Sequence, residues 1–396
     1  MLPQSQARIA RVSLRNYRSI AGCTVDLGPL TFLVGPNGAG KSNFLDALRL
    51  VRDSLRTTLD HALRERSGIA EVRRRSSGHP MDLGIGLHFV LPGGVTGHLA
   101  FDIGARPGGY VVKKEECVVG KARYLIAEGQ VVHPAGPVAP PAVDDRLYLV
   151  SASGLPEFRP AYDLLSHMGL YNINPEQIRA LQPPDKGELL ERDGRNLASV
   201  LERLRKTDVG IVERIEQYLS RIVPDLTSVS SIPVGHMETL EFRQRVKGAK
   251  QPWRLNAINM SDGTLRALGI LVALFQAQAE SRIPVVAIEE PEVALHPAAA
   301  GLLRDALVDA SRSVQVVVTS HSPELLDDPG IIEEQILAVS GAEGVTHIDR
   351  IDEASRTALK DRLYTAGELL RSNQLAPERR VQADSNQLKL FDENAP

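Results

Sequence analysis

The sequence predicts an α/β fold with a core of mainly parallel strands, an antiparallel β lobe and an inserted helical lobe. Three observations favour it. A glycine-rich stretch at 35–42 joins an apolar run to an amphipathic helical pattern, which makes a strand–loop–helix unit. Two later apolar runs, at 283–288 and 314–318, end in polar residues, as strands buried on both faces of a parallel sheet do. Short β-rich runs and then a helical pattern lie between these units.

Composition indicates an ordinary globular chain. Its 396 residues are 43% hydrophobic and 24% charged, and the formal net charge of −3 gives no overall signature of nucleic-acid binding. Cys23 and Cys117 are far apart, which argues against a disulfide framework or a zinc site and fits a reducing compartment. We see no signal-peptide pattern and no apolar run of about 18 residues, so we expect a cytoplasmic protein without a membrane span.

The elements before the glycine-rich stretch read as two strands within residues 9–34. The second strand includes the apolar run 30–34 and is interrupted by a turn at Gly28-Pro29.

Residues 35–42 have the pattern GxxxxGKS, which is the P-loop, between a strand and a helix as the motif requires. The glycines let backbone N–H groups point at phosphate oxygens, and the helix N-terminus adds partial positive charge. Lys41 can reach the β- and γ-phosphates, and the hydroxyl of Ser42 can bind Mg²⁺. We therefore predict that ATP and Mg²⁺ are bound here, with nucleotide contacts from Gly35, Asn37, Gly38, Gly40, Lys41, Ser42 and Asn43.

A basic stretch follows the helix that the P-loop opens. Two interpretations stay open: a solvated loop, or a contact with the DNA backbone near the nucleotide site. Its residues are Arg64, Arg66, Arg73, Arg74 and Arg75.

The middle of the chain changes pattern several times. Residues 81–132 alternate β-rich runs with Gly-rich turns and predict an antiparallel meander. A proline-rich linker at 133–141 and a short strand at 147–150 follow. Residues 160–222 are predicted to be mainly helical, and 226–247 return to strand-like alternation.

The run 283–288 ends in two carboxylates, Glu289 and Glu290. Ligands of open α/β sheets bind at the carboxyl ends of the strands. Glu289 is therefore expected to hold Mg²⁺, through water, and Glu290 to act as general base toward the attacking water.

The run 314–318 ends in Thr319-Ser320-His321-Ser322, and His321 could donate to the γ-phosphate or orient the water. A further polar group, Ser261-Asp262-Gly263-Thr264, opens an apolar helix. Ser261 fits an N-cap, and a helix N-terminus with Gly263 is an anion site. Taken alone, this group is also what an ordinary capped helix looks like.

The order of these motifs resembles the ATP-binding-cassette ATPases of the structural-maintenance-of-chromosomes (SMC) and RecF type. It resembles more closely the stand-alone AAA-type ATPases related to the OLD (overcoming lysogenisation defect) nucleases. The resemblance covers most of residues 9–50 and 255–325, through Asn16-Tyr17-Arg18-Ser19, Gly35 to Asn43, Ser261 to Leu265, Glu289-Glu290-Pro291-Glu292 and Leu295-His296-Pro297.

The resemblance implies a RecA-like P-loop NTPase fold, an ABC-type head, that works as a head-to-tail homodimer with two ATP molecules at the interface. Ser261, Asp262 and Gly263 would be the signature motif that meets the γ-phosphate of the opposite subunit, and His321 the switch histidine. The chain departs from the family in reading Ser-Asp-Gly-Thr for Ser-Gly-Gly-Gln, and we place no Q-loop glutamine. The chain after His321 is too short for the Toprim nuclease of full OLD proteins, so we expect ATP hydrolysis without DNA cleavage.

The tail contains Gln387-Leu388-Lys389-Leu390-Phe391, which resembles the peptide with which bacterial proteins bind the sliding clamp of the replisome. Leu390 and Phe391 would fill an apolar pocket, while Gln387 makes polar contacts and Leu388 completes the motif.

We therefore expect an ATP-gated dimeric ATPase, SMC-like and RecF-like, in DNA maintenance, DNA repair or antiviral defence, with duplex DNA as a partner. The alternative is a regulatory ATPase that controls a separate effector such as a nuclease and binds no DNA. A transporter subunit is a more distant third. The expected domains are an N-terminal ATPase lobe (1–150), a helical insertion (151–225), a C-terminal ATPase lobe (226–375) and a disordered tail (376–396).

Overall fold

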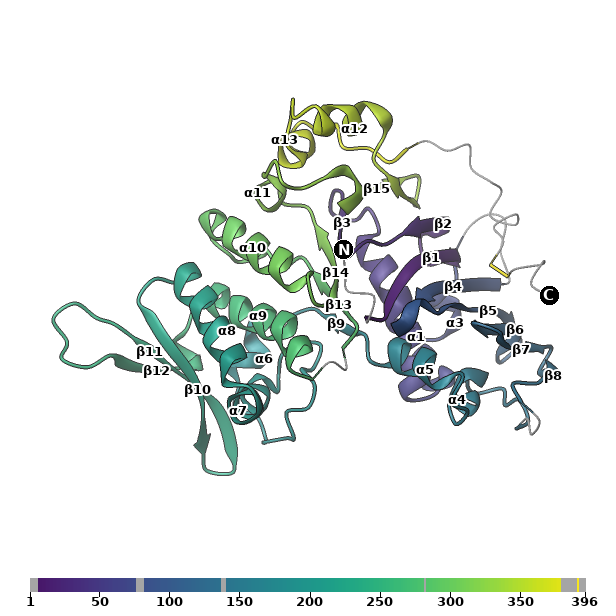
Figure 1. The fold of residues 1–396 in the computed structure, drawn as a ribbon, viewed down its shortest axis with the longest axis horizontal. Coiled ribbons are helices and arrows are strands. Elements are labelled where there is room, and N and C mark those ends of the chain that lie inside the picture. The colour runs from purple at the N-terminus through teal and green to yellow at the C-terminus, as the bar shows by residue number, and fades with distance from the viewer. Residues whose placement is uncertain (1–5, 76–81, 137–139, 281–282, 379–389, 392–396) are drawn as a thin grey trace.

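The computed structural model describes residues 6–75, 82–136, 140–280, 283–378 and 390–391. Within these ranges, one mixed sheet of 13 strands runs through the molecule in the order β8-β7-β6-β5-β4-β1-β2-β16-β15-β3-β14-β13-β9 (Figure 1). A second, antiparallel sheet has the order β10-β11-β12 and projects from the helical side of the molecule. The predicted α/β class with an antiparallel β lobe and a helical insertion is confirmed.

The parallel centre of the large sheet brings together strands that are distant in sequence. Each pair of neighbouring strands in this centre is parallel. Glu289 pairs with Thr319 on the next strand, and Ser320 pairs with Val34. The carboxyl ends of three central strands are therefore level. The parallel strands are β15 (Ile336–Ala342), β3 (Leu30–Val34), β14 (Gln315–Ser320), β13 (Val285–Glu289) and β9 (Gly169–Tyr171).

Alternate residues of these strands face two different hydrophobic cores, as the period of a strand requires. Leu33 and Val317 pack in the core that contains α1 (Lys41–Arg56), whereas Phe32 and Val318 pack in the core that contains α9 (Asp262–Glu280). Burial on both faces explains why these strands read as continuous apolar runs.

The antiparallel wing confirms the predicted meander, since each of its strands pairs antiparallel with the next. The interpretation of residues 9–34 as two strands was wrong. Val25 lies in a strand that pairs antiparallel with β1, and the run 30–34 leaves that strand at the Gly28-Pro29 turn to enter the parallel centre. The wing comprises β1 (Arg8–Tyr17), β2 (Ile20–Asp26), β4 (Asp82–Val90), β5 (Thr96–Arg106), β6 (Gly109–Val119), β7 (Ala122–Ala127) and β8 (Gln130–His133).

The strand expected at 147–150 is instead a helix, α4 (Tyr148–Ala152). The buried carboxylate of Glu115 accepts hydrogen bonds from the N–H groups of Tyr148 (2.7 Å) and Leu149 (2.9 Å), so it satisfies the free donors of the first turn. Burial raises the pKa of Glu115 to about 6. The other short helices of this half of the chain are α2 (Leu59–Arg64), α3 (Ile69–Val72) and α5 (Arg159–Ser166).

The insertion between β9 and β13 forms the left half of Figure 1. The range 160–222 is not wholly helical, because β9 lies within it as an edge strand of the large sheet. The strand-like alternation predicted at 226–247 is confirmed as a hairpin. The insertion contains α6 (Pro175–Arg179), α7 (Leu197–Thr207), α8 (Val209–Ile222), β10 (Leu226–Val234), β11 (Met237–Gln244), β12 (Trp253–Asn256) and α9.

The C-terminal part contributes helices to the core that contains α9 and two strands to the large sheet. Its elements are α10 (Ala300–Ala310), α11 (Pro323–Leu326), β15, β16 (Val345–Arg350), α12 (Glu353–Lys360) and α13 (Ala366–Arg371). The first residues of the tail expected to be disordered are paired with the fold: Pro377 bridges to Ile351, and the N–H of Glu378 donates to the carbonyl of Arg350 at 2.7 Å. Apart from 390–391, the rest of this tail lies outside the described residues. No helix in the described part of the chain is both long and apolar enough to cross a membrane.

Candidate active site

The P-loop follows β3 and is braced by the C-terminal strands. Gly40 has φ of 104°, and a Cβ built on it would lie 2.0 Å from the hydroxyl oxygen of Thr346. A Cβ on Gly35 would lie 2.0 Å from the carbonyl oxygen of Val339. Only glycine fits either position, so these two glycines are required by close packing as well as by loop curvature.

Hydrogen bonds complete this support. The hydroxyl of Thr346 donates to the carbonyl of Ala39 at 2.8 Å and lies 2.7 Å from the hydroxyl of Ser19. The side-chain amide of Asn43 donates to the same Ser19 hydroxyl at 2.6 Å. Asn43 therefore points toward the strand support, and its expected role at the nucleotide stays a prediction, as does that of Asn37.

The ammonium group of Lys41 lies under the loop. Its side chain is 4% exposed, and Nζ donates to the carbonyls of Gly35 at 2.8 Å and Pro36 at 3.0 Å. Burial lowers the pKa of Lys41, while the carboxylates of Glu290 and Glu292 act in the opposite direction. Lys41, which the motif predicts to contact the phosphates, is thus held in place by two carbonyl groups of the P-loop.

Glu290 follows β13 and reaches Lys41, with Oε1 at 3.7 Å from Nζ. Its backbone has φ of 41°, and its N–H donates to the carbonyl of Thr319 on the neighbouring strand at 3.0 Å. A non-glycine residue in this left-handed region stores backbone strain, which is common at functional sites. The strained backbone turns this carboxylate toward the P-loop.

His321 follows β14 and faces the same carboxylate. Its Nδ1 lies 3.3 Å from Glu290 Oε1, and its backbone N–H donates to Glu292 Oε1 at 3.2 Å. Glu292 Oε1 also accepts a 2.7 Å hydrogen bond from the hydroxyl of Ser320. We predicted no separate role for Glu292. Its carboxylate holds the end of β14 in place, directly before His321.

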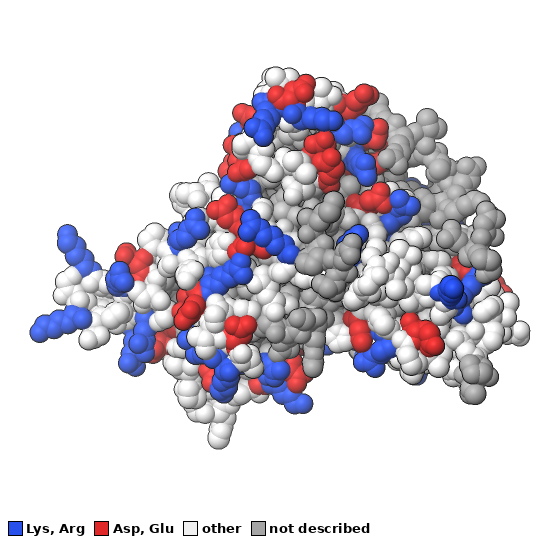
Figure 2. Space-filling model, viewed as in Figure 1, with Lys and Arg blue, Asp and Glu red and all other residues white. Residues whose placement is uncertain are grey.

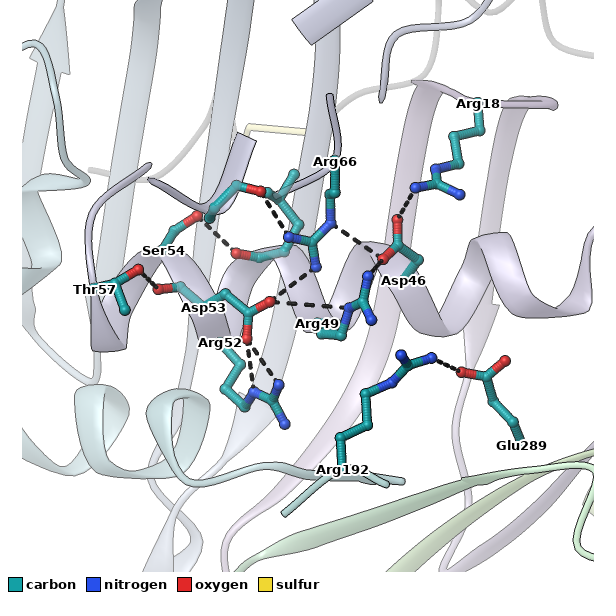
Figure 3. A network of polar contacts seen from close by, with 12 residues as sticks. Arg18, Asp46, Arg49, Arg52, Asp53, Ser54, Thr57, Arg66, Arg192 and Glu289 are labelled. Carbon is teal, nitrogen blue, oxygen red and sulfur yellow. Dashed lines mark hydrogen bonds and ion pairs between the residues drawn. The ribbon is translucent and has the colours of Figure 1, made fainter. Parts of the chain in front are cut away.

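Glu289 is engaged by an arginine from the insertion. Arg192 donates to Glu289 Oε1 at 2.8 Å, as Figure 3 shows. Both residues line a cavity of about 110 Å³ together with Ser42, so the two residues expected to hold Mg²⁺ do face one space. A hydroxyl and a carboxylate are suitable oxygen donors for that ion.

A buried ion network on α1 forms the wall of this cavity (Figure 3). Asp46 Oδ2 accepts from the hydroxyl of Tyr17 and from Arg18, each at 2.8 Å, and Oδ1 accepts from Arg49 at 2.6 Å and from Arg66 at 3.1 Å. The same Arg66 donates to Asp53 at 3.0 Å. The cavity side of this helix is therefore lined by guanidinium groups.

The network also bears on the basic stretch. The side chain of Arg66 is 1% exposed and paired within the fold, so it is not available as a DNA contact. Arg64 pairs with Asp60 at 2.8 Å, and Arg75 pairs with Glu71. Much of the positive charge counted in this stretch is thus neutralised locally.

The residues expected to form the signature motif lie at the start of α9. The hydroxyl of Ser261 accepts from the N–H of Thr264 at 3.3 Å, which is N-cap geometry, and Asp262 pairs with Arg179 of α6. A Cβ on Gly263 would lie 2.6 Å from the carbonyl oxygen of Ala294. Arg266 on the same helix donates to the carbonyl of Glu290 at 3.2 Å, so α9 is tied to the end of β13.

Polar atoms without partners lie at this junction. Glu292 Oε2 and Arg266 Nε are buried and have no hydrogen-bond partner among the described residues. Buried polar groups are normally satisfied, so these atoms fit a place that a polar ligand occupies. In the described ranges, no group of three or more His, Cys, Asp and Glu residues is arranged to hold a metal ion by itself.

The tail motif is described only in part. Gln387 and Leu388 lie outside the described residues. Leu390 is 4% exposed and packs over Gly84 of β4, where an added Cβ would lie 2.2 Å from its Cδ1. Lys114 Nζ lies 4.0 Å from the centre of the Phe391 ring.

Sequence reasoning missed Arg192, Arg266 and Glu292. Arg192 lies in an irregular segment far from every motif, and no pattern in the sequence marks it. Glu292 stands in the quoted Glu-Glu-Pro-Glu group, so its position was visible but its partner was not. Arg266 follows the signature group by less than one helical turn from Gly263, which is the signal that could have placed it on the same face.

The chain is similar to known ATPase domains and to OLD nucleases. Two protein families match parts of the chain: "AAA ATPase domain" over residues 8–88, and "AAA domain, putative AbiEii toxin, Type IV TA system" over residues 159–327. The Old nuclease of Escherichia phage P2 is 24% identical over 362 residues, which cover 81% of this chain and 57% of the phage protein. The OLD nuclease of Thermus scotoductus is 46% identical over 43 residues, which cover 11% of this chain and 8% of that protein.

Solved structures of SMC heads share the fold. A head bound to the C-winged helix domain of ScpA has a TM-score of 0.56 at 14% identity, covering 88% of this chain and 99% of that chain. A head with an extended coiled coil from Pyrococcus furiosus has a TM-score of 0.56 at 12% identity, covering 90% and 99%. A head with a coiled coil and joint from Pyrococcus yayanosii has a TM-score of 0.51 at 12% identity, covering 90% and 100%.

Proposed function

We propose that this chain, which has a P-loop ATPase fold of the AAA/ABC type and resembles SMC heads and OLD proteins, binds and hydrolyses ATP with Mg²⁺. The observation that carries the proposal is the meeting of three strand ends, after β3, β13 and β14. The carboxylate oxygen Oε1 of Glu290 lies 3.7 Å from Nζ of Lys41 and 3.3 Å from Nδ1 of His321.

Each residue has a distinct task in this proposal. Bound Mg²⁺–ATP would supply the phosphate charge and the phosphorus that water attacks. Lys41 offers its ammonium group to the phosphates, and Ser42 and Glu289 hold the metal ion, Glu289 through water. Glu290 accepts the proton of the attacking water, and His321 orients that water.

The test of the general base is Glu290→Gln. The amide keeps the size of the side chain but cannot take a proton, so hydrolysis should fall by about 100-fold or more while ATP binding stays. A fluorescent ATP analogue measures binding, and phosphate release measures turnover. Glu343→Gln is a matched control, because Glu343 also has a positive φ, 50°, but is exposed at the β15–β16 turn.

Undiminished turnover in Glu290→Gln would refute the general-base role. Loss of binding in the same variant would instead indicate that the carboxylate organises the P-loop through Lys41.

The finer role is an ATP-gated dimer in DNA maintenance, repair or defence against phage. The SMC-head fold and the similarity to the phage Old nuclease support it, although the chain spans only 57% of the length of that nuclease. The alternative is a regulatory ATPase for a separate effector such as a nuclease. Hydrolysis stimulated by DNA, with an effect that fades as salt rises, would favour the first role, and hydrolysis indifferent to DNA would favour the second.

A sliding clamp remains a proposed partner through Gln387, Leu388, Leu390 and Phe391. Since Leu390 packs against β4 and Phe391 lies beside Lys114, both would have to leave the β lobe to bind a clamp. Binding of the intact chain to a purified clamp, lost in the double variant Leu390→Ala and Phe391→Ala, is the expected result. If the intact chain does not bind the clamp, the proposed partnership is refuted.

A further inference from the structure

The hairpin that projects from the insertion carries an unusual charge pattern. Strands β11 and β12 are joined by residues 245–252, at the far left of Figure 1. The segment 243–254 contains no Asp or Glu, in a chain whose net charge is −3. Lys and Arg side chains extend from this tip in Figure 2. The basic residues of the segment, all exposed, are Arg243, Arg245, Lys247, Lys250 and Arg254.

The pairing of the two strands places like charges together. Arg243 lies directly opposite Arg254 in the β11–β12 register. Like charges directly opposite one another destabilise a sheet. Glu241 comes only within 3.8 Å of Arg243, and no carboxylate among the described residues pairs with Lys247, Lys250 or Arg254. The fold therefore leaves most of this positive charge without a carboxylate partner, which suits an anionic ligand.

The same hairpin carries an exposed aromatic ring. Trp253, the only tryptophan of the chain, is 57% exposed, and no aromatic ring or cation in the described part of the chain stacks on it. An exposed indole on a hairpin that also carries cations matches the surfaces that hold single strands, where bases stack on aromatic rings and cations follow the backbone. The bases of a duplex stay stacked on one another and would leave this ring unused.

The hairpin leads in sequence to an element of the candidate site. From β12 the chain passes through the short turn Ala257–Asn259 to Ser261 and α9. Arg266 of α9 donates to the carbonyl of Glu290. One segment of the chain therefore connects the hairpin to the strand end that carries Glu290.

We propose that segment 243–254 binds single-stranded nucleic acid, with phosphates at its Lys and Arg side chains and a base stacked on Trp253. This rests on the proposed function only in taking nucleic acid as a partner, and it moves the contact away from the basic stretch at Arg64 to Arg75.

The first experiment titrates the full chain, without ATP, with oligothymidylate and follows tryptophan fluorescence. Because Trp253 is the only tryptophan, quenching reports this surface alone. We expect quenching by the single strand, much less by a duplex of equal length, and an affinity that falls as salt rises. No quenching, equal quenching by duplex, or quenching by an acidic polypeptide such as polyglutamate would overturn the proposal.

The second experiment measures the anisotropy of a labelled oligothymidylate with variants. Trp253→Ala should weaken binding roughly 5- to 150-fold. The triple variant Arg243→Gln, Lys250→Gln and Arg254→Gln should lower the slope of log affinity against log salt by about 2. The matched control, Arg64→Gln, Arg73→Gln and Arg75→Gln, should leave both values unchanged, and an equal loss in this control would refute the assignment.

The two proposals can fail separately. Glu290→Gln and Glu343→Gln should both bind oligothymidylate as the parent chain does, because neither changes the hairpin. Hydrolysis without quenching would refute only the hairpin proposal, and quenching without hydrolysis would refute only the proposed ATPase.

Discussion

Arg192 forms an ion pair with Glu289, the carboxylate expected to hold Mg²⁺. Its guanidinium lies 2.8 Å from Glu289 Oε1, in the cavity that Ser42 also lines. A bound metal ion would compete with this ion pair for the same oxygen. We therefore expect Arg192 to release Glu289 when Mg²⁺ and nucleotide bind.

Arg192→Ala should lower the Mg²⁺ concentration needed for half-maximal binding of a fluorescent ATP analogue, by up to about five-fold. The size follows from a half-exposed ion pair, which contributes about 1 kcal/mol at most. Arg195→Ala is the control, since Arg195 pairs with Asp193 in the same segment at 2.9 Å and lies outside the cavity lining. A higher Mg²⁺ requirement in Arg192→Ala would mean that Arg192 assists the ligand instead of competing with it.

At the scale of single elements, α1 does more than follow the P-loop. It carries Asp46, whose side chain is 8% exposed and joins Arg49 of the same helix to Tyr17, Arg18 and Arg66 from other parts of the fold. Removing one partner of a buried ion network leaves the others buried without compensation.

Asp46→Asn should therefore lower the free energy of unfolding by about 3 kcal/mol, because Arg66 would keep only Asp53. Asp60→Asn, which breaks an exposed pair with Arg64, should cost less than about 1 kcal/mol. Urea unfolding followed by circular dichroism compares the two. Equal losses would show that the network contributes no more than a surface pair does.

The central strands were predictable because a continuous apolar run that ends in polar residues is typical of a buried parallel strand. Strands β13 and β14 are buried on both faces, and each ends in the polar residues that the site uses. The short apolar run at 147–150 had no such constraint, and the carboxylate of Glu115, distant in sequence, decides that it forms α4. β9 has only the residues Gly169–Tyr171 and pairs with β13 alone. Three residues are too few to show the alternating pattern from which a strand is predicted. Arg192 is missed for the same reason, since only the tertiary fold brings it to Glu289.

At the scale of the whole molecule, the residues that we propose as the signature motif face outward. Ser261 and Asp262 are exposed at the start of α9, and the described contacts link them to Thr264 and Arg179 but not to the P-loop. A helix N-terminus with small residues can take a phosphate from another molecule. Two copies in head-to-tail contact would complete each nucleotide site with the other copy's signature loop, which is the dimer we propose.

The dimer can be tested in the Glu290→Gln background, where ATP should persist and hold two copies together. Size-exclusion chromatography with light scattering should then show a dimer with ATP and a monomer without it. Adding Ser261→Arg should abolish the dimer, because the long side chain fills the space that a phosphate needs at the helix end. Adding Ser261→Ala should preserve it, since that change loses only the N-cap, at about 1 kcal/mol. A dimer that survives Ser261→Arg would mean that the two copies meet through another face.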